Sequence, residues 1–263
     1  MTAVIDRLKR AVRRILPRPL DPWLDAPVVA SPLDARYAAA YESALHDSER
    51  ADPFARGRFE DGKRWRTILD RVVVDDGPIL DLASGSGGIA LALAAGGRRM
   101  ITMDRAWSET ARLAHRAAGA PYRHVIADSA QLPFRDGVFS GVICLDAFEH
   151  FARPAETAAE ATRTARPEAP LIVETPGRMT YLLRRDPHYD VRFLLMLPNA
   201  MQQRIALRRG FTEPHHYVHR IYFSAATIAR FFPATRIVRI LGRTRLPKRW
   251  FFSAVIVRKS AAD

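Results

Sequence analysis

Between residues 77 and 175, short apolar runs alternate with longer segments of helical spacing. The apolar runs predict strands at 78–83, 100–103, 124–127, 138–145 and 171–174, and the segments between them predict helices at 89–95, 108–118 and 154–164. Two later strands are expected at 236–241 and 251–258, after a helix near 224–232. Strands that alternate with helices are typical of βαβ units. We therefore expect an α/β fold with a doubly wound, mostly parallel sheet and helices on both of its faces.

The N-terminal part of the chain has a different pattern. Residues 1–20 place apolar side chains at helical spacing with arginines and a lysine between them, and Pro17, Pro19 and Pro22 end the helix. A basic amphipathic helix of this kind resembles an interfacial membrane anchor. It could equally dock on its own domain or on a second subunit. Residues 31–74 are mainly helical and polar, with one interruption near Asp52 and Pro53.

Composition adds a strong basic character. The net charge is +13, and only four of the 41 basic residues are lysines. Arginine suits phosphate and carboxylate groups because its planar fork donates two parallel hydrogen bonds. Nucleic acid, an anionic membrane surface and an acidic substrate are all compatible with this charge, as is an arginine-rich surface in water.

Several classes of protein are excluded. No apolar stretch approaches the roughly 20 residues that a membrane span needs, and residues 1–20 lack the continuous apolar stretch of a signal peptide. A single cysteine, Cys144, excludes an internal disulfide framework and a site with several cysteine ligands for a metal. We expect a cytoplasmic protein without a bound metal, with the inner membrane surface as a candidate peripheral location.

Candidate chemistry gathers at the ends of the predicted strands. The first strand runs into the glycine loop of residues 81–88, whose glycines permit a tight turn and a close approach of a ligand to the backbone. Asp104, Asp128 and Asp146 stand at the ends of the next three strands. Open α/β sheets bind ligands at this edge. The loop has no Gly-Lys-Ser/Thr sequence and no six-position dinucleotide pattern, so it matches neither a phosphate-binding loop nor a dinucleotide fold.

These four segments, in this order, resemble the motifs of class I S-adenosylmethionine (SAM)-dependent methyltransferases. Residues 81–88 resemble the acidic residue and glycine loop of motif I, with Ala83 in place of the first glycine. Residues 146–151 resemble the segment after strand four in many members that act on small molecules. The resemblance covers about residues 77–176, with a weaker match at 251–258. It implies a Rossmann-like, seven-stranded methyltransferase fold with an N-terminal helical extension.

The resemblance also implies roles for individual residues. Asp104 would hold both ribose hydroxyls of SAM, and Asp128 would contact the adenine amino group. The expected cofactor-binding residues are Asp81, Ala83, Ser84, Gly85, Gly87, Asp104, Arg105, Asp128, Ser129 and Asp146. The expected organisation is a helix and linker at 1–22 and one methyltransferase domain at 31–263. Within that domain, 77–176 form the SAM-binding core and 177–222 an insert over the substrate.

Residues outside the motifs suggest how the reaction could proceed. His150, one turn past Asp146, is the candidate general base, with a packing role as its alternative. His188 is a second candidate, whereas His215, His216 and His219 lack the carboxylate or cysteine spacing of a metal site. Cys144 lies in an apolar strand and is expected to be a core thiol, which weakens any reading as a cytosine-C5 methyltransferase. Tyr37 and Tyr41, one helical turn apart, could close over the cofactor or pack in the core.

Together these features predict transfer of a methyl group from SAM to an oxygen or nitrogen atom of a small-molecule, lipid-linked or glycan-linked acceptor. Two alternatives remain. One is an RNA methyltransferase that uses the basic surface, although no Asn/Asp-Pro-Pro-aromatic motif follows strand four. The other is a non-catalytic SAM-binding protein of the same fold, which the ordered acids at three strand ends argue against.

Overall fold

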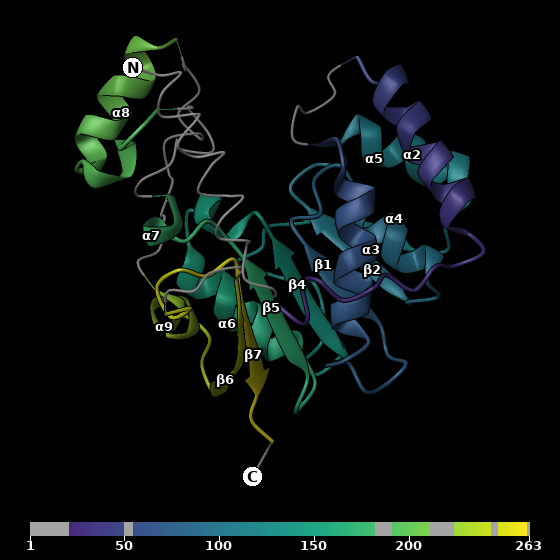
Figure 1. The fold of residues 1–263 in the computed structure, drawn as a ribbon. Helices are drawn as coiled ribbons and strands as arrows, with labels where there is room; N and C mark the ends of the chain where they lie inside the picture. Colours follow the sequence, from purple (N-terminus) through teal and green to yellow (C-terminus); the bar gives the residue numbers. More distant parts are fainter. Residues whose placement is uncertain (1–20, 50–54, 182–190, 211–223, 243–246, 262–263) are drawn as a thin grey trace.

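A twisted seven-stranded sheet organises the chain in the computed structural model, which describes residues 21–49, 55–181, 191–210, 224–242 and 247–261 (Figure 1). The strand order is β3-β2-β1-β4-β5-β7-β6. Strands β1 to β5 pair in parallel, and β7 runs antiparallel between β5 and β6. The strands are β1 Ile79–Leu82, β2 Met100–Asp104, β3 Arg123–Ile126, β4 Gly141–Leu145, β5 Pro170–Glu174, β6 Thr235–Leu241 and β7 Ala254–Lys259. The predicted mostly parallel, doubly wound sheet is confirmed.

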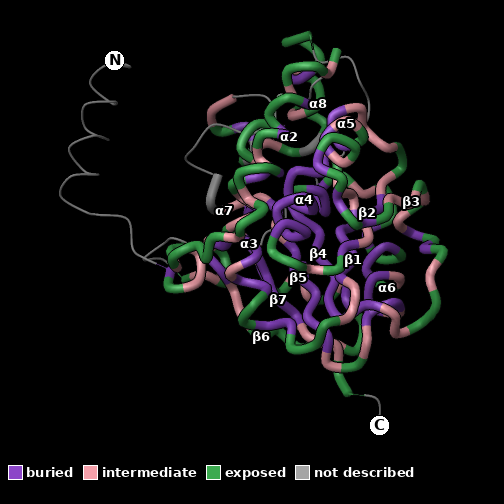
Figure 2. The backbone as a smooth tube through the Cα atoms, turned by 90° about the vertical axis from the view of Figure 1, so that its right-hand side faces the viewer, coloured by how far each residue is buried: buried purple, intermediate pink, exposed green. Residues whose placement is uncertain are grey.

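Helices cover both faces of the sheet, and each face has its own apolar cluster. One cluster joins the sheet to helices α2 Asp34–Asp47, α3 Arg58–Leu69, α4 Gly88–Ala95 and α5 Glu109–Ala118. The other joins the sheet to α6 Pro154–Thr164 and α9 Ala225–Ala229. Buried backbone fills the middle of the molecule between these layers (Figure 2). The two clusters supply the hydrophobic stabilisation that fixes the strand order.

Helix α4 follows the glycine loop and is buried along its whole length. It packs closely against α3 at Gly62, where an added Cβ would lie 2.6 Å from the Ala92 Cβ and 2.9 Å from the Ile89 Cα. Only glycine fits such an approach without a shift of backbone. The spacing between α3 and α4 is therefore set at Gly62.

The predicted strand bounds are within one residue of the structure except in two strands, which begin three residues later than expected. The fourth strand was expected from residue 138 but begins at Gly141, because Phe139 forms an isolated parallel bridge with Ala165 instead of joining β1. The last strand was expected from residue 251 but begins at Ala254, where its pairing with β5 and β6 starts.

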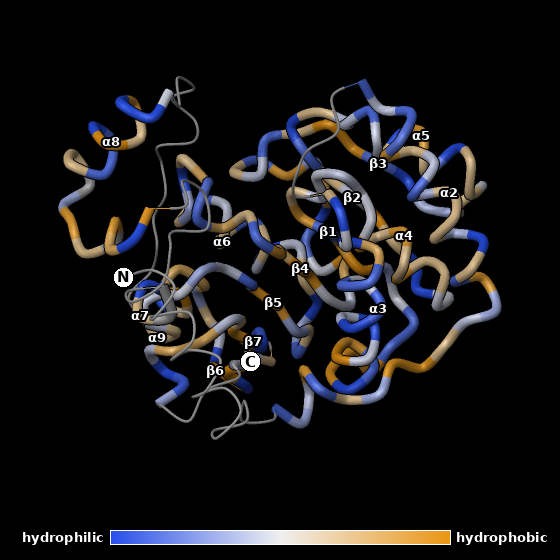
Figure 3. The backbone as a smooth tube through the Cα atoms, turned by 45° about the horizontal axis from the view of Figure 1, so that its top comes forward, coloured by the Kyte–Doolittle hydropathy of each residue, from blue (hydrophilic) through white to orange (hydrophobic). Residues whose placement is uncertain are grey.

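The expected insert at 177–222 is described in part. It contains α7 Arg178–Tyr181, the 3-10 turn η3 Leu194–Met196 and α8 Asn199–Arg208. Figures 1 and 3 show α8 standing away from the sheet and its covering helices. The N-terminal helix expected at 1–20 lies outside the described residues, as do His188, His215, His216 and His219. None of the helices in the described ranges is long and apolar enough to cross a membrane.

Candidate active site

The glycine loop turns sharply between β1 and α4. Ala83, Gly85 and Gly87 all have positive φ angles, of 62°, 52° and 76°. This conformation costs an L-residue with a side chain about 1–2 kcal/mol, so Ala83 carries strain that the glycine of the usual motif would not. A Cβ added to Gly85 would meet no atom within 4 Å, so the backbone at Gly85 borders open space. Room at this point is what a ligand that approaches the loop needs.

Two buried polar atoms at the loop have no partner among the described residues. They are Asp81 Oδ2, in a side chain that is 3% exposed, and Ser84 Oγ. Burial raises the pKa of Asp81 to about 7, with Asp104 adding to the shift and Arg58 opposing it. An unpartnered buried polar group costs about 1–3 kcal/mol, so both atoms favour a bound donor or acceptor.

Asp104 at the end of β2 lies directly beside the loop. The Gly85 amide donates to Asp104 Oδ2 at 2.9 Å, and the Arg105 amide donates to Oδ1 at 2.6 Å. Ser108 Oγ donates in turn to the Gly85 carbonyl oxygen at 2.9 Å. The second strand end is thus tied to the glycine loop by its own carboxylate, and the residue remains partly exposed.

Asp128 and Ser129 follow β3 and face the start of α6. Arg153 Nη2 lies 2.6 Å from Asp128 Oδ2, and the Ala130 amide donates to Oδ1 at 2.9 Å. The Ala130 amide and then Arg153 hold the pKa of Asp128 below its usual value. Ser129 Oγ and Thr157 Oγ1 share a hydrogen bond of 3.0 Å. The structure thus connects the third strand end to α6 through polar contacts.

Arg58 is a site residue that the sequence analysis missed. It begins α3, and its Nη1 pairs with Asp146 Oδ2 at 2.7 Å while Nη2 donates to the Leu145 carbonyl oxygen at 3.2 Å. Burial alone would lower the pKa of Arg58, but the charges of Asp146 and Glu174 outweigh it and raise the pKa. A cation in the first turn of a helix opposes the helix dipole. An arginine at the start of a predicted helix was therefore the feature of the sequence that could have indicated a role for Arg58.

Glu174, at the end of β5, belongs to the same group of charges. Burial and the neighbouring Asp146 raise the pKa of Glu174, whereas Arg58 acts in the opposite direction. Asp146 itself has a positive φ of 55°, and its amide donates to the Glu174 carbonyl oxygen at 3.0 Å. One arginine therefore faces acidic groups from the ends of β1, β4 and β5.

His150 ends the 3-10 turn η2 Phe148–His150, directly after this group of charges. Its Nε2 lies 3.8 Å from Oε1 of Glu149, whose side chain is 1% exposed, while the histidine side chain is 35% exposed. Burial raises the pKa of Glu149 to about 7, and Thr175 Oγ1 donates to Glu149 Oε2 at 2.8 Å. A solvent-reached imidazole next to a buried carboxyl group is an arrangement that can move a proton.

Tyr37 and Tyr41 are buried residues of α2, and Tyr41 contacts the glycine loop. The Tyr41 hydroxyl donates to the Ala55 carbonyl oxygen at 2.9 Å and shares a 2.7 Å hydrogen bond with Ser86 Oγ. A Cβ on Gly88 would lie 2.6 Å from the Tyr41 ring. The structure therefore supports packing in the core rather than closure over the cofactor for both tyrosines. The contacts of Tyr41 with Ser86 and Gly88 also hold the glycine loop in place.

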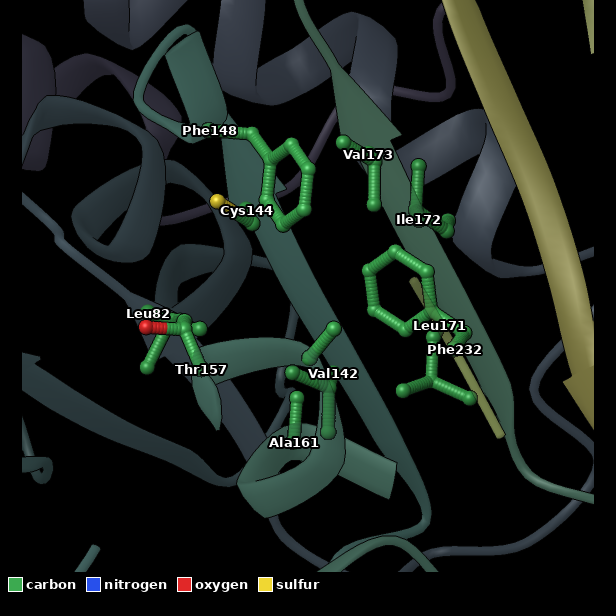
Figure 4. Close-up of a pocket in the computed structure, with 11 residues that line it drawn as sticks. Leu82, Val142, Cys144, Phe148, Thr157, Ala161, Leu171, Ile172, Val173 and Phe232 are labelled. Atoms are coloured by element: carbon green, nitrogen blue, oxygen red, sulfur yellow. The ribbon is translucent and has the colours of Figure 1, made fainter. Parts of the chain in front are cut away.

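A small apolar cavity lies on the α6 face of the sheet, among Cys144, Phe148, Thr157, Phe232 and neighbouring strand residues (Figure 4). Its free volume is about 10 Å³, so it would hold about one water molecule and no cofactor. Burial raises the pKa of the Cys144 thiol well above its usual value. Cys144 is therefore the core thiol that the sequence predicts. No group of three potential metal ligands occurs in the described ranges.

Comparisons with known proteins agree with this geometry. Residues 80–173 match the model of a family described as "Methyltransferase domain". A search of curated proteins gives no match.

Solved structures share the fold at low sequence identity. The PH0226 protein from Pyrococcus horikoshii has a TM-score of 0.53 at 16% identity, over 81% of this chain and 94% of that chain. A SAM-dependent methyltransferase from Methanosarcina mazei has a TM-score of 0.51 at 20% identity, over 74% and 98%. The 1,6-didemethyltoxoflavin-N1-methyltransferase of Burkholderia thailandensis, with S-adenosylhomocysteine bound, has a TM-score of 0.51 at 16% identity, over 92% and 94%. Residues 80–173 are thus a methyltransferase domain, and the chain has the fold of class I SAM-dependent methyltransferases.

Proposed function

We propose that the chain transfers the methyl group of SAM to an oxygen or nitrogen atom of a small-molecule, lipid-linked or glycan-linked acceptor. The observation that carries the proposal is the convergence of the glycine loop, Asp104 and the Arg58–Asp146 pair at one edge of the sheet. The similar Burkholderia enzyme has the small molecule 1,6-didemethyltoxoflavin bound. The inert thiol of Cys144 argues against methylation through a cysteine nucleophile.

The residues present fit SAM. Open space at Gly85 and the unpartnered Asp81 Oδ2 and Ser84 Oγ leave both room and hydrogen-bonding capacity at the loop. We assign the ribose hydroxyls to Asp104, because a carboxylate can accept two hydrogen bonds side by side. We assign Arg105 and the pair Asp128 and Ser129 to the adenine end, since they follow the ends of the adjacent strands β2 and β3.

The charge balance of the site also fits. In the described part of the chain, Asp81, Asp146, Glu149 and Glu174 surround or adjoin the cation of Arg58. SAM carries a sulfonium and an ammonium group besides one carboxylate, so the acidic surplus suits its two positive charges and Arg58 suits its carboxylate. When bound, SAM supplies an activated methyl group for in-line displacement, and the contribution of the protein is mainly positioning.

His150 is the proposed general base. An acceptor hydroxyl of high pKa must lose its proton during transfer, and a neutral imidazole can accept it. Glu149 lies 3.8 Å from the imidazole Nε2, where it would stabilise the imidazolium once the proton has moved. An acceptor that is already nucleophilic would not need this step.

The first test is calorimetry of SAM and S-adenosylhomocysteine binding. We expect both to bind, and Asp104→Ala to weaken binding by about 1–3 kcal/mol because it leaves ligand donors unpaired. Asp75→Ala is the matched control, since Asp75 also accepts a backbone amide, that of Gly77 at 2.7 Å, but stands before β1 at the opposite edge. Absence of binding at millimolar ligand would refute the proposal.

The acceptor is found by a screen of acceptor classes with labelled SAM. Transfer to small molecules, lipids or glycans supports the proposal. Transfer to RNA alone, with a steep loss of RNA binding as salt rises, would establish the alternative of an RNA methyltransferase. Binding of SAM with no transfer to any class would favour a non-catalytic protein.

A further inference from the structure

Residues 191–210, which include η3 and α8, have a one-sided charge. This 191–210 segment holds four arginines and no aspartate or glutamate; the arginines are Arg192, Arg204, Arg208 and Arg209. In the described part of the chain, no side-chain hydrogen bond or ion pair joins any of them to another residue. By contrast Arg66 of α3 pairs with Asp34 at 2.8 Å, and Arg163 of α6 pairs with Asp136 and Glu160. The positive charge of the segment is thus not neutralised by any described residue.

The same segment exposes large apolar side chains. Phe193, Met196, Met201 and Leu207 are 49%, 57%, 48% and 51% exposed. Phe193 also adopts a positive φ of 59°, which is a strained conformation for a bulky residue. Among the described residues, only Leu194 and Ala206 form the buried cluster of this segment. Two buried residues are a small core, and the remaining apolar surface is left facing solvent.

The position of α8 relates this surface to the active site. In Figure 1 the arrow of β7 points down, toward the C-terminus, and β7 is antiparallel to β5. The parallel strands therefore end at the top, on the side where α7 and α8 lie. Figure 3 shows α8 separate from the sheet in a second view. The glycine loop and Asp146 occupy the same edge, so a surface in contact with α8 would lie on the side where the active site opens.

We propose that the 191–210 segment docks on the surface of an anionic phospholipid bilayer. Interfacial segments combine arginines, which are attracted to anionic headgroups, with apolar side chains that enter the boundary of the acyl chains. Each cation near such a surface strengthens association about fivefold. RNA fits less well, because three of the four exposed apolar residues are aliphatic and offer no ring on which a base could stack. Docking does not depend on which acceptor is methylated, so it goes beyond the proposed function.

The test is sedimentation of the full-length protein with vesicles of phosphatidylcholine, alone or mixed with phosphatidylglycerol. We expect binding to the anionic vesicles only. Arg204→Gln, Arg208→Gln and Arg209→Gln together should weaken it about 100-fold, at about fivefold for each charge. Phe193→Ser, Met196→Ser and Leu207→Ser together should weaken it at least tenfold, because each removes apolar area from the acyl boundary. Residues 1–20 are present in every variant, so their contribution is common to all.

Matched controls remove the same charge and the same apolar surface elsewhere. Arg112→Gln, Arg116→Gln and Arg123→Gln together replace three exposed arginines of α5 and β3, and Val74→Ser with Ile126→Ser replaces two exposed apolar residues. Both controls should bind vesicles within about twofold of the natural chain, since docking elsewhere leaves these positions in water. All variants should keep the SAM affinity and melting temperature of the natural chain, which shows that they fold.

Three results would overturn the proposal. The first is vesicle binding that the segment variants leave unchanged. The second is an equal loss in the arginine control, which would attribute binding to net charge alone. The third is binding to an RNA oligonucleotide, weakened by the arginine variant, with no binding to vesicles.

Discussion

The glycine-loop edge of the sheet and the 191–210 segment are both rich in charge, yet they hold it in opposite ways. At the edge, Arg58 lies among Asp81, Asp146 and Glu174, and both oxygen atoms of the Asp104 carboxylate accept hydrogen bonds from backbone amides. In the 191–210 segment, arginines stand beside exposed apolar side chains with no acid among them.

This difference separates two kinds of recognition. Charges that are buried and opposed cannot rearrange without a large loss, so they suit one ligand of fixed shape and charge. Charges that are exposed and unopposed can adapt, so they suit a broad surface. We assign the cofactor to the first kind of site and the proposed contact with the bilayer to the second.

His150 lies beside the buried Glu149 at the glycine-loop edge, and its removal should have the largest effect. With a hydroxyl acceptor, His150→Ala should reduce kcat by about 10²–10⁴ while SAM affinity stays normal. The rate of the natural chain should rise with pH as the imidazolium loses its proton, because only the neutral ring accepts one. Steady-state kinetics across pH, with the acceptor found in the screen, measures both.

His46→Ala is the control for this prediction, since it removes an exposed histidine near the end of α2. Full activity of His150→Ala with an unchanged pH profile would show that His150 is structural. Loss of SAM binding in the same variant would place it under the cofactor as a packing residue.

Arg58→Ala tests whether the opposed charges at the edge serve the ligand. The variant loses the cation assigned to the carboxylate of SAM, so we expect SAM affinity to fall by about 2–3 kcal/mol, the scale of a hydrogen bond to a charged group. Calorimetry at constant pH measures the change. Arg98→Ala is a closely matched control, because Arg98 pairs with Asp70 at 2.6 Å with exposures of 19% and 47%, against 19% and 48% for Arg58 and Asp146. An equal change in both variants would contradict the assignment.

Glu149→Gln tests the burial of acid at the edge through the stability of the fold. Burial raises the folded-state pKa of Glu149 from 4.5 to about 7, so the folded chain holds the extra proton between these values. As far as Glu149 is concerned, the free energy of unfolding is greatest below about pH 4.5, and it falls as the pH rises from there to about 7.

Glutamine carries no charge at any pH, so we expect Glu149→Gln to be more stable than the natural chain by about 3 kcal/mol at pH 8 and equal to it near pH 4. Denaturant unfolding at the two pH values measures the difference, with the exposed Glu42→Gln as control. A variant less stable than the natural chain at pH 8 would mean that the charged carboxylate is stabilised in the fold.

The sequence predicted the edge well because its pattern there is local. Asp81, Asp104 and Asp146 each stand within or at the end of an apolar strand, and parallel strands end at the same edge. The contact between Arg58 and Asp146 could not be read the same way, because it joins residues 88 positions apart. Only the packing of α3 on α4 brings them together.

The rest of the site escaped prediction for other physical reasons. The buried Glu149 accepts a hydrogen bond from Thr175, 26 positions away, and no periodicity in the sequence indicates such a contact. The insert gave no pattern because, within its described residues 191–210, the buried cluster holds only Leu194 and Ala206, which form no repeating apolar face. The sequence shows the arginines of this segment and its lack of acidic residues. It does not show that large apolar side chains beside them are exposed, and that exposure is what indicates a docking surface.

Gly62 has a consequence for how this enzyme can vary. It lies one helical turn beyond Arg58 on the face of α3 that touches α4, and a Cβ there would meet the Ile89 backbone. Any larger residue would lift the helix and draw the guanidinium away from Asp146, although residue 62 lies outside the proposed cofactor contacts. A variant at residue 62 would therefore behave in assays as a cofactor-affinity mutant. Substitution at this buried position could therefore change the affinity for the cofactor without changing the residues around the methyl acceptor.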